Sequence, residues 1–516
     1  STAFAEEPLS AIEWLDNSKS VIPEKKEINN LELESTKKKV LPIIKTKLDP
    51  INLNGIGIIP SYVANLKYNL WVDTSETTIA TRIESLKKSK FSKARTLLKR
   101  ILIIESDPPL SDNSKGTTTN TFLLSRIDKL IEIGALDEAE TLLFKIEPLN
   151  RMAFSRFKKV AFLTGRLDKL CQILEERPKL TNDISARIIC LSRLGDWNAS
   201  AIILSSASAL NALSPEREEL LMFYLDPDLF EDKTVARGQK MLDPITFYVG
   251  ELNGFKRKID KLPPPYLYND VNNKHAPLRR KITAAESLVR SIGINGSRLF
   301  NMYRSNKAAG SGGLWERMIL IQRLDEALQQ NEPIAIQRAV VAATSAMAKA
   351  DLLIPFSDEY GSRLKNLTIS EKNEIFNETI TKIFSLRGEI PRHWFSYVPQ
   401  SQKLSMAVSL IKGDKIESLN YNFYDQTNKI LPALLEEILL NQKINVIKNS
   451  DADSSQGLII LKALELVSNG IETDPVDLQR SLKMLVRAGQ NEFAKSLVVE
   501  FLIRSMRPTP EEYHAS

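Results

Sequence analysis

The chain of 516 residues has few of the side chains that most often bind metals or act as nucleophiles. It contains three histidines, His275, His393 and His514, and two cysteines. No two histidines have metal-ligand spacing, and the cysteines do not complete a site. The Gly-x-Ser-x-Gly turn of α/β-hydrolases is also missing. The sequence therefore specifies no reaction, metal or cofactor, although a Ser-His-Asp arrangement brought together by folding stays open.

Long apolar runs and an excess of one charge are missing as well. No stretch of about 18 uninterrupted apolar residues is present, so we expect no transmembrane segment. Lys and Arg total 70 against 64 Asp and Glu, a net charge of +6 that is small for this length. Nucleic-acid binders concentrate far more positive charge on one face. We therefore expect no nucleic-acid partner.

The most informative feature that is present is a repeated phrase: an apolar helix, a glycine, and a second helix with a small residue five positions later. It occurs at Gly134, Gly165 and Gly195, spaced 31 and 30 residues apart, and again at Gly489. The Gly165 copy departs from it, with Leu170 at the small position. Such a period is typical of stacked helical hairpins, whose surfaces usually bind partners.

The phrase has a physical basis. A glycine ends a helix in the left-handed conformation at little steric cost, and Asp196 is placed to cap the helix that follows Gly195. Small side chains at Ala94, Ala139 and Ala494 allow close helix packing. We interpret Trp197, Trp315 and Trp394, which fall at or near helix starts, as packing residues or as anchors of a binding groove.

Residues 1–5, Ser-Thr-Ala-Phe-Ala, have the small-x-small form of a signal-peptidase site. We interpret them as a signal-peptide remnant, with Glu6 as the mature start. This predicts a soluble, exported, periplasmic protein of a bacterial envelope. If the site is not real, the protein is cytoplasmic. Cysteine content suits both compartments.

Residues 6–60 read as an extended arm with one amphipathic stretch. Leu9, Ile12, Trp14 and Leu15 have helical spacing and form one apolar face. We expect this face to dock on a partner, or back on the chain's own fold.

Helical periodicity then predicts an N-terminal helical-repeat lobe at 61–260, a C-terminal helical lobe at 266–507 and a tail at 508–516. The division falls at the proline-rich residues 261–266, which should stop a helix. In the second lobe, helices are expected near 400–412, 429–442, 455–469, 475–488 and 490–506. We find no strand after residue 60, and residues 56–60 read as a short strand or a loop.

The only glycine-rich loop precedes a helix at Leu314. Backbone amides of Gly310, Gly312 and Gly313, together with Arg304 or Arg317, are a candidate anion site. The loop lacks the Lys-Ser/Thr of a P-loop, and no strand precedes it. A flexible turn between helices is the alternative interpretation.

The two cysteines, Cys171 and Cys190, fall on the apolar sides of neighbouring helices. A disulfide between them is geometrically possible, and two buried thiols are the alternative. The sequence leaves this choice open.

The Gly-x-x-x-x-Ala-x-x-Leu phrase at Gly134 and Gly489, with looser copies at Gly165 and Gly195, resembles tetratricopeptide (TPR) repeats. Its period is near 30 rather than about 34 residues. The resemblance implies an all-α fold, an irregular superhelix or solenoid of antiparallel helix hairpins that is TPR-like in part. The Ala-Phe-Ala site, the amphipathic arm and the helical body together also look like uncharacterised exported bacterial helical proteins.

Three functions follow as hypotheses. The first is a non-catalytic scaffold or adaptor of the bacterial cell envelope, which binds protein partners through its repeat surface. The second is a protein that binds or processes cell-wall glycan, with peptidoglycan or another anionic polymer as partner. It draws on the helical superhelix of soluble lytic transglycosylases, whose Gly-Leu-Met-Gln signature is missing here. The third is a cytosolic repeat adaptor.

Overall fold

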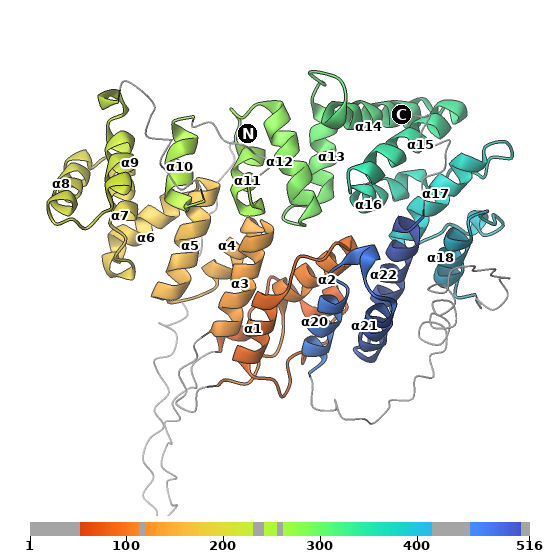
Figure 1. The fold of residues 1–516 in the computed structure, drawn as a ribbon, viewed down its shortest axis with the longest axis horizontal. Coiled ribbons are helices and arrows are strands. Elements are labelled where there is room, and N and C mark those ends of the chain that lie inside the picture. The colour runs from red at the N-terminus through yellow and green to blue at the C-terminus, as the bar shows by residue number, and fades with distance from the viewer. Residues whose placement is uncertain (1–51, 113–119, 231–241, 255–261, 415–454, 507–516) are drawn as a thin grey trace, which may run out of the picture. The chain divides into compact units, whose positions relative to one another are not determined.

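The computed structural model describes residues 52–112, 120–230, 242–254, 262–414 and 455–506 (Figure 1). All of them belong to one compact unit, Pro50–Ser516. They are predominantly helical, which confirms the all-α prediction. The signal remnant, the amphipathic stretch at 9–15 and the helix expected at 429–442 lie outside the described residues.

The helices of the first half follow one another along the chain, and the connections between α3 and α9 are short. They are α1 (Glu76–Ser85), α2 (Ser92–Ile103), α3 (Thr121–Ile133), α4 (Leu136–Phe144), α5 (Arg151–Thr164), α6 (Asp168–Glu176), α7 (Ile184–Arg193), α8 (Trp197–Ala209), α9 (Pro215–Leu225) and α10 (Pro244–Leu252).

The helices of the second half include the longest in the described residues. They are α11 (Pro264–Asn272), α12 (Leu278–Arg290), α13 (Gly296–Ser305), α14 (Gly313–Gln330), α15 (Pro333–Lys349), α16 (Leu353–Leu364), α17 (Glu374–Arg387), α18 (Gln402–Lys412), α20 (Gln456–Leu466), α21 (Pro475–Arg487) and α22 (Asn491–Arg504).

The glycines of the repeated phrase separate helices as expected. Gly134, Gly165, Gly195 and Gly489 have φ of 84°, 74°, 90° and 72°, the left-handed conformation that ends a helix. Asp196 caps α8, because its side chain accepts a hydrogen bond from the Ala199 amide. The helices on either side of each glycine pack together, as α3 does with α4 and α7 with α8.

The small residues of the phrase lie in the core, as predicted. Ala94, Ala139 and Ala494 are at most 1% exposed. The proline-rich segment behaves differently from the expectation that it only stops a helix. Pro264 is the first residue of α11, because proline fits the first helical turn, where its missing N–H has no partner to lose. The division into two lobes stays a prediction.

The expectation of no strand after residue 60 is wrong. Strand β1 (Ile59–Pro60) pairs in parallel with β2 (Ile104–Glu105). Each strand has two residues, which is too short for an alternating pattern to show in the sequence. A Cβ on Gly57 would lie 2.0 Å from the Glu105 nitrogen, so the absence of a side chain permits this approach of two backbones.

A buried arginine fixes the same region to α3. Arg126 is 1% exposed and donates hydrogen bonds to the carbonyl oxygens of Asn54, Ile56, Leu102 and Ile104, at 2.8 to 3.2 Å. Burial lowers its pKa to about 9, still above neutral pH. The charged side chain therefore joins both strand segments to one helix.

Cys171 in α6 and Cys190 in α7 form a disulfide, which settles the choice that the sequence left open. The bond joins two helices that also pack against each other. The bond lies in the region of the repeated phrases. A covalent bond and apolar packing therefore both hold α6 against α7.

The last helices pack against the first ones. Helix α20 packs on α1 and α2, and α22 packs on α2, α17, α18 and α21, as Figure 1 shows with the blue helices beside α1 and α2. The Lys90 amide donates to the Ser468 carbonyl at 2.9 Å, and the Gly457 amide to the Leu70 carbonyl at 2.8 Å. We call this packing of α20 and α22 against α1 and α2 the seam.

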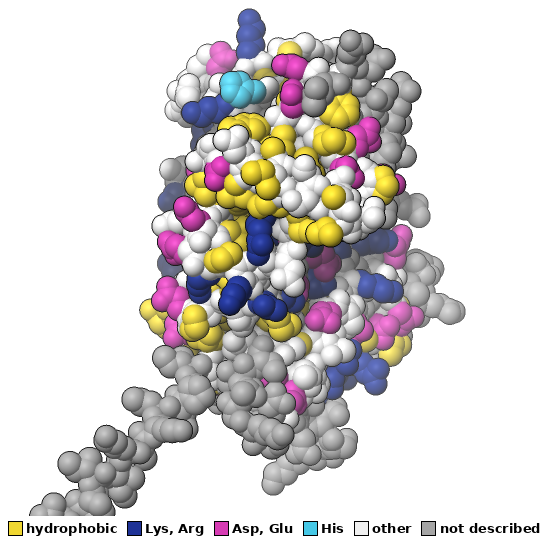
Figure 2. All heavy atoms as spheres, turned by 90° about the vertical axis from the view of Figure 1, so that its left-hand side faces the viewer, with side chains coloured by type: hydrophobic (Ala, Val, Ile, Leu, Met, Phe, Trp, Pro, Cys, Tyr) yellow, Lys and Arg dark blue, Asp and Glu magenta, His cyan; other side chains and the backbone are white. Residues whose placement is uncertain are grey.

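Large apolar side chains are exposed at α8. Figure 2 shows apolar side chains gathered on the face that carries α7, α8 and α9. Leu194 is 50% exposed, Trp197 51%, Ile202 65% and Leu210 78%. For Trp197 the packing interpretation therefore does not hold, since half of its side chain is in solvent.

Candidate functional site

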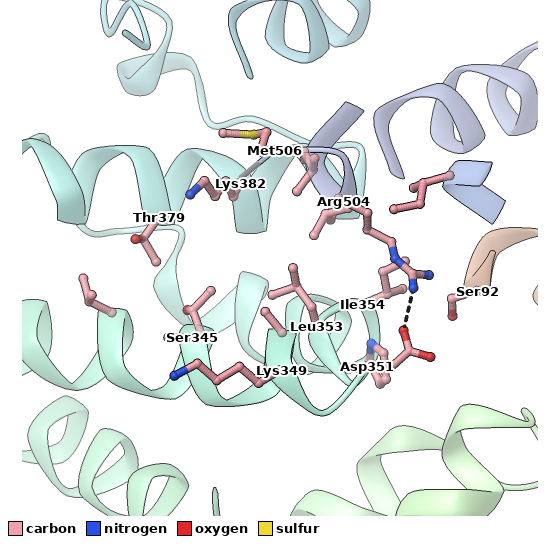
Figure 3. A pocket seen from close by; sticks show the side chains of 17 residues that line it. Ser92, Ser345, Lys349, Asp351, Leu353, Ile354, Thr379, Lys382, Arg504 and Met506 are labelled. Carbon is pink, nitrogen blue, oxygen red and sulfur yellow. Dashed lines mark ion pairs between the residues drawn. The ribbon is translucent and has the colours of Figure 1, made fainter. Parts of the chain in front are cut away.

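A pocket of about 560 Å³ lies beside the seam, in a size range typical of ligand sites. Residues of α2, α15, α16, α17, α22 and the short helix η11 (Gly470–Glu472) line it. We call it the seam pocket. It is shown in Figure 3, where Ser92, Ser345, Lys349, Leu353, Lys382 and Arg504 are among the labelled side chains.

The walls of the seam pocket are mainly apolar. Leu353, Ile354 and Ile503 contribute aliphatic side chains. Two threonines in the lining also present little polar surface. The hydroxyl of Thr344 donates to the Val340 carbonyl, and that of Thr379 to the Ile375 carbonyl, both at 2.7 Å. Because each hydroxyl is used within its own helix, the threonines leave mainly their methyl groups for contact with a ligand.

The charge of the lining is positive. Lys349, Lys382 and Arg504 are its cations, and Asp351 is its one carboxylate. An Arg504 Nη2 to Asp351 Oδ1 distance of 3.1 Å marks an ion pair. Figure 3 shows this pair at one end of the pocket and the two lysines at the other. Among the described contacts Lys349 has no ion-pair partner, so its positive charge at the lysine end is open to a ligand.

Glu500 fixes the α22 wall to α2. It is 0% exposed, and its carboxylate accepts hydrogen bonds from the Ser92 and Lys93 amides at 2.7 and 2.8 Å. Arg504 Nη1 lies 3.2 Å from the same carboxylate. Phe91, the N-cap residue of α2, makes no side-chain cap. Glu500 thus supplies the missing cap from the other end of the chain.

Burial and neighbouring charges shift the pKa values around Asp351. Burial raises the pKa of Glu500, although the Lys93 and Ser92 amides and Arg504 oppose the shift. Burial lowers the pKa of Arg95, which Asp351 and Glu500 partly offset. The pKa of Lys88 is lowered by burial and by Arg95. Each pKa shift indicates a charged group that is partly removed from water. These groups beside Asp351 therefore hold helices together rather than bind a ligand.

A second pocket, of about 550 Å³, contains the carboxylates Glu138, Asp358 and Glu359. Each lies close to a cation: Lys99 at 2.5 Å from Glu138, Lys93 at 3.6 Å from Asp358, and Arg304 at 2.5 Å from Glu359. A glycosidase needs a general acid with a raised pKa.

The pKa of Glu359 is lowered, whereas a general acid needs a raised pKa. Although burial raises the pKa of this carboxyl group, hydrogen bonds from Ser297 and Arg304 outweigh burial and lower it. This carboxylate therefore suits an ion-pair network better than proton donation to a glycosidic oxygen.

The glycine-rich loop forms the start of α14, with Gly312 as its N-cap. Positive φ values of 74° and 55° at Gly312 and Gly313 explain the choice of glycine there. A Cβ on Gly310 would meet the Trp315 ring at 3.0 Å, so the loop turns closely around that side chain.

Both arginines proposed for the anion site bind carboxylates of the chain itself. Arg304 pairs with Asp325 at 3.1 Å and with Glu359 at 2.5 Å, while Arg317 makes two-pronged hydrogen bonds to Glu286. An anion at the loop would compete with these partly buried pairs. The anion site stays a prediction, as does docking by Leu9, Ile12, Trp14 and Leu15, which lie outside the described residues.

Sequence reasoning missed the seam pocket. Its lining runs from Ser92 to Met506, and no local pattern connects residues so far apart. The available signals were separate: the apolar stripes of α15 and α22, and a run of small residues in α15 that leaves room beside the helix.

Within the described residues, no group of three or more His, Cys, Asp or Glu side chains is arranged to hold a metal ion. The described helices also include none with the length and apolarity needed to cross a bilayer.

Comparison with protein-family models, with curated proteins and with solved structures found no match to this chain. The resemblance to TPR repeats therefore rests on the repeated phrase alone.

Proposed function

We propose that this protein is a non-catalytic adaptor, and that it holds a short apolar segment of a protein partner in the seam pocket. The observation that carries the proposal is the lining itself: aliphatic walls with three cations and a single carboxylate. Such a site favours a ligand with an apolar body and an acidic group.

The positions of the charges indicate how the segment binds. Arg504 is already neutralised by Asp351 and Glu500. Lys349 is exposed at the other end of the lining, and Lys382 lies on the same side in Figure 3. A carboxylate of the partner, from a side chain or a C-terminus, therefore binds at Lys349, and apolar side chains lie against Leu353, Ile354 and Ile503.

The disulfide supports placing this adaptor in the bacterial envelope. Disulfides persist in oxidising compartments such as the periplasm and are rare in the cytosol, and Cys171 and Cys190 are bonded. The TPR-like solenoid arrangement belongs to the same proposal, supported by the spacing of the repeated phrase and by the packing of successive helices.

The proposal is tested by photo-crosslinking in the cells from which the protein comes. A benzophenone amino acid replaces Ser345 in the pocket of the full-length protein, and in a second strain it replaces Lys372, an exposed position outside the lining. Mass spectrometry then identifies the crosslinked peptides. We expect capture of an apolar, acidic segment from the Ser345 position and not from Lys372.

Charge reversal then tests the role of the lysine end. Lys349→Glu should reduce capture from Ser345 at least about tenfold, equivalent to about 1.4 kcal/mol of binding free energy, whereas Lys372→Glu should leave it unchanged. Equal capture from both crosslinker positions would overturn the pocket as the binding site. Capture of glycan fragments alone would favour the cell-wall hypothesis instead.

A further inference from the structure

The described part of the chain ends at the seam pocket. Met506 is the last described residue, and it belongs to the lining. The end of α22 holds it there, because the Met506 amide donates a hydrogen bond to the Ile503 carbonyl at 3.3 Å. Figure 3 shows Met506 at the upper wall, on the side of Lys382, and Lys349 at the wall below. The residues that follow Met506 are therefore attached directly at the pocket.

The tail at 508–516 has the chemistry that the pocket favours. The tail lies outside the described residues, but its sequence contains Glu511, Glu512 and Tyr513 in succession and no Lys or Arg. The ligand proposed above has an apolar body and an acidic group, and a carboxylate next to an aromatic side chain combines both. The tail is thus complementary in charge to the lysine end, where Lys349 is exposed.

The connection is long enough for this contact. Five residues lead from Met506 to Glu511 and span at most about 18 Å when extended. Lys349 belongs to α15, which packs against α17, and the axes of packed helices lie only about 8–10 Å apart. Since Met506 and Lys349 line the same pocket, the acidic residues reach the lysine without any movement of the described helices.

We infer that the tail occupies the lysine end of the seam pocket and competes there with the partner's segment. A carboxylate of Glu511 or Glu512 pairs with Lys349. The Tyr513 ring lies against Leu353 in the apolar wall. This inference rests on the proposed function, because it concerns the same pocket, and it adds regulation: the protein restricts access to its own binding site.

The attachment of the tail favours it over other occupants. A segment tethered beside its site by a short linker has an effective concentration in the millimolar range, which a separate molecule seldom reaches. The carboxylate of the lining does not oppose it, because Asp351 is paired with Arg504 at the other end. A partner therefore displaces the tail only when its own segment binds more tightly, which would exclude weak ligands.

Photo-crosslinking of the purified full-length protein tests occupancy without any partner. With the benzophenone amino acid at Ser345, we expect an internal crosslink to the tail in a product that migrates as the 58.2 kDa monomer. At Lys372, outside the lining, we expect none. Glu511→Gln/Glu512→Gln should reduce the crosslink at least about fivefold, because it removes both charges that face Lys349.

An adjacent pair of glutamates in α6 provides the matched control. Glu175 and Glu176 are exposed and lie outside the lining, so Glu175→Gln/Glu176→Gln changes the net charge equally and should leave the crosslink unchanged. The tail substitution also tests competition in cells. If the tail holds two thirds of the pockets or more, Glu511→Gln/Glu512→Gln should raise capture of the partner from Ser345 at least about threefold, and the control pair should not.

The two measurements separate this inference from the function on which it rests. If no internal crosslink forms, or if Glu511→Gln/Glu512→Gln leaves it at full strength, tail binding is wrong even when a partner is captured. Partner capture that the tail substitution does not raise would overturn the competition. A crosslinked dimer would assign the pocket to a segment of a second copy instead. An internal crosslink without partner capture in any variant would support tail binding and overturn the adaptor function.

Discussion

The helices α3 to α8 and the seam differ in how far apart along the chain their contacting residues lie. In the first region each helix packs on the next one, across a turn of a few residues. In the seam, the Ser92 amide and Glu500 are separated by 408 positions, and Arg82 and Glu465 by 383. Residues close together in the sequence therefore form the contacts of α3 to α8. The contacts of the seam form only when the last helices pack against the first ones.

The two regions also differ in chemistry. The repeated phrases are held mainly by buried aliphatic, aromatic and small side chains, with Arg126 and Lys129 of α3 as buried charged exceptions. The seam buries a carboxylate, Glu500, among backbone amides and Arg504. A buried polar group is favourable only when all its partners are in place. The seam should thus be the more sensitive region to a single polar substitution.

The largest expected effect is at Glu500. Glu500→Ala leaves the Ser92 and Lys93 amides without their cap and Arg504 without its buried partner. Breaking a buried charge pair typically costs about 3–5 kcal/mol, so we expect the free energy of unfolding to fall by about that amount in urea denaturation.

Glu492 provides the control on the same helix. It pairs with Lys495, but its side chain is 78% exposed, so Glu492→Ala should change stability by less than about 0.5 kcal/mol. If the two variants were equally stable, the seam would not depend on Glu500, and the contrast between the two regions would weaken.

The disulfide gives the next largest effect, in the repeat region. Closing a loop of 19 residues should stabilise the fold by about 3 kcal/mol through the unfolded chain. Reduction should therefore lower the midpoint of urea denaturation, while the double variant Cys171→Ala/Cys190→Ala should not respond to the reductant. Alkylation of two thiols in the native, unreduced protein would contradict the bond.

The smallest expected effect is the difference in stability between two glycine variants. Gly134 and Gly195 both have positive φ, so alanine should cost about 1 kcal/mol at each for the left-handed backbone. A Cβ at Gly195 meets nothing within 4 Å, whereas at Gly134 it lies 2.6 Å from Leu288 Cδ2. We expect Gly134→Ala to cost about 2 kcal/mol more because of overpacking.

Thermal denaturation of the two variants measures this difference. If both variants lost the same stability, only the backbone conformation at Gly134 would matter, and the contact with α12 would add nothing. A larger loss of stability for Gly134→Ala would show that this glycine, besides ending a helix, is needed for the packing against Leu288.

Much of the helical structure could be predicted because its causes are local. The expected helix at 400–412 is observed as α18 (Gln402–Lys412), and that at 490–506 as α22 (Asn491–Arg504). Glycine ends and caps depend on backbone conformation within one turn, so the sequence carries them. The strand β2 was missed because its pairing depends on Gly57, almost fifty residues earlier, rather than on its own two residues.

The candidate site could not be predicted in the same way. Arg504 lies in α22 and Asp351 in the turn between α15 and α16, and no common motif connects them. They form a pair because α22 packs beside α2 and α17. The glycine-rich loop, by contrast, was visible in the sequence, but the sequence could not show that Arg304 and Arg317 would bind Asp325, Glu359 and Glu286.

The amino-acid sequence by itself determined that the chain is helical, where several described helices begin or end, and which small residues lie between them, because propensity, capping and periodicity act within one or two turns. Only the tertiary structure decided that Cys171 bonds Cys190, that Glu500 caps α2, that a positively charged apolar pocket lies beside the seam, and that α8 exposes large apolar side chains to solvent. These features depend on which helices meet in space, and that is settled by packing summed over the whole unit.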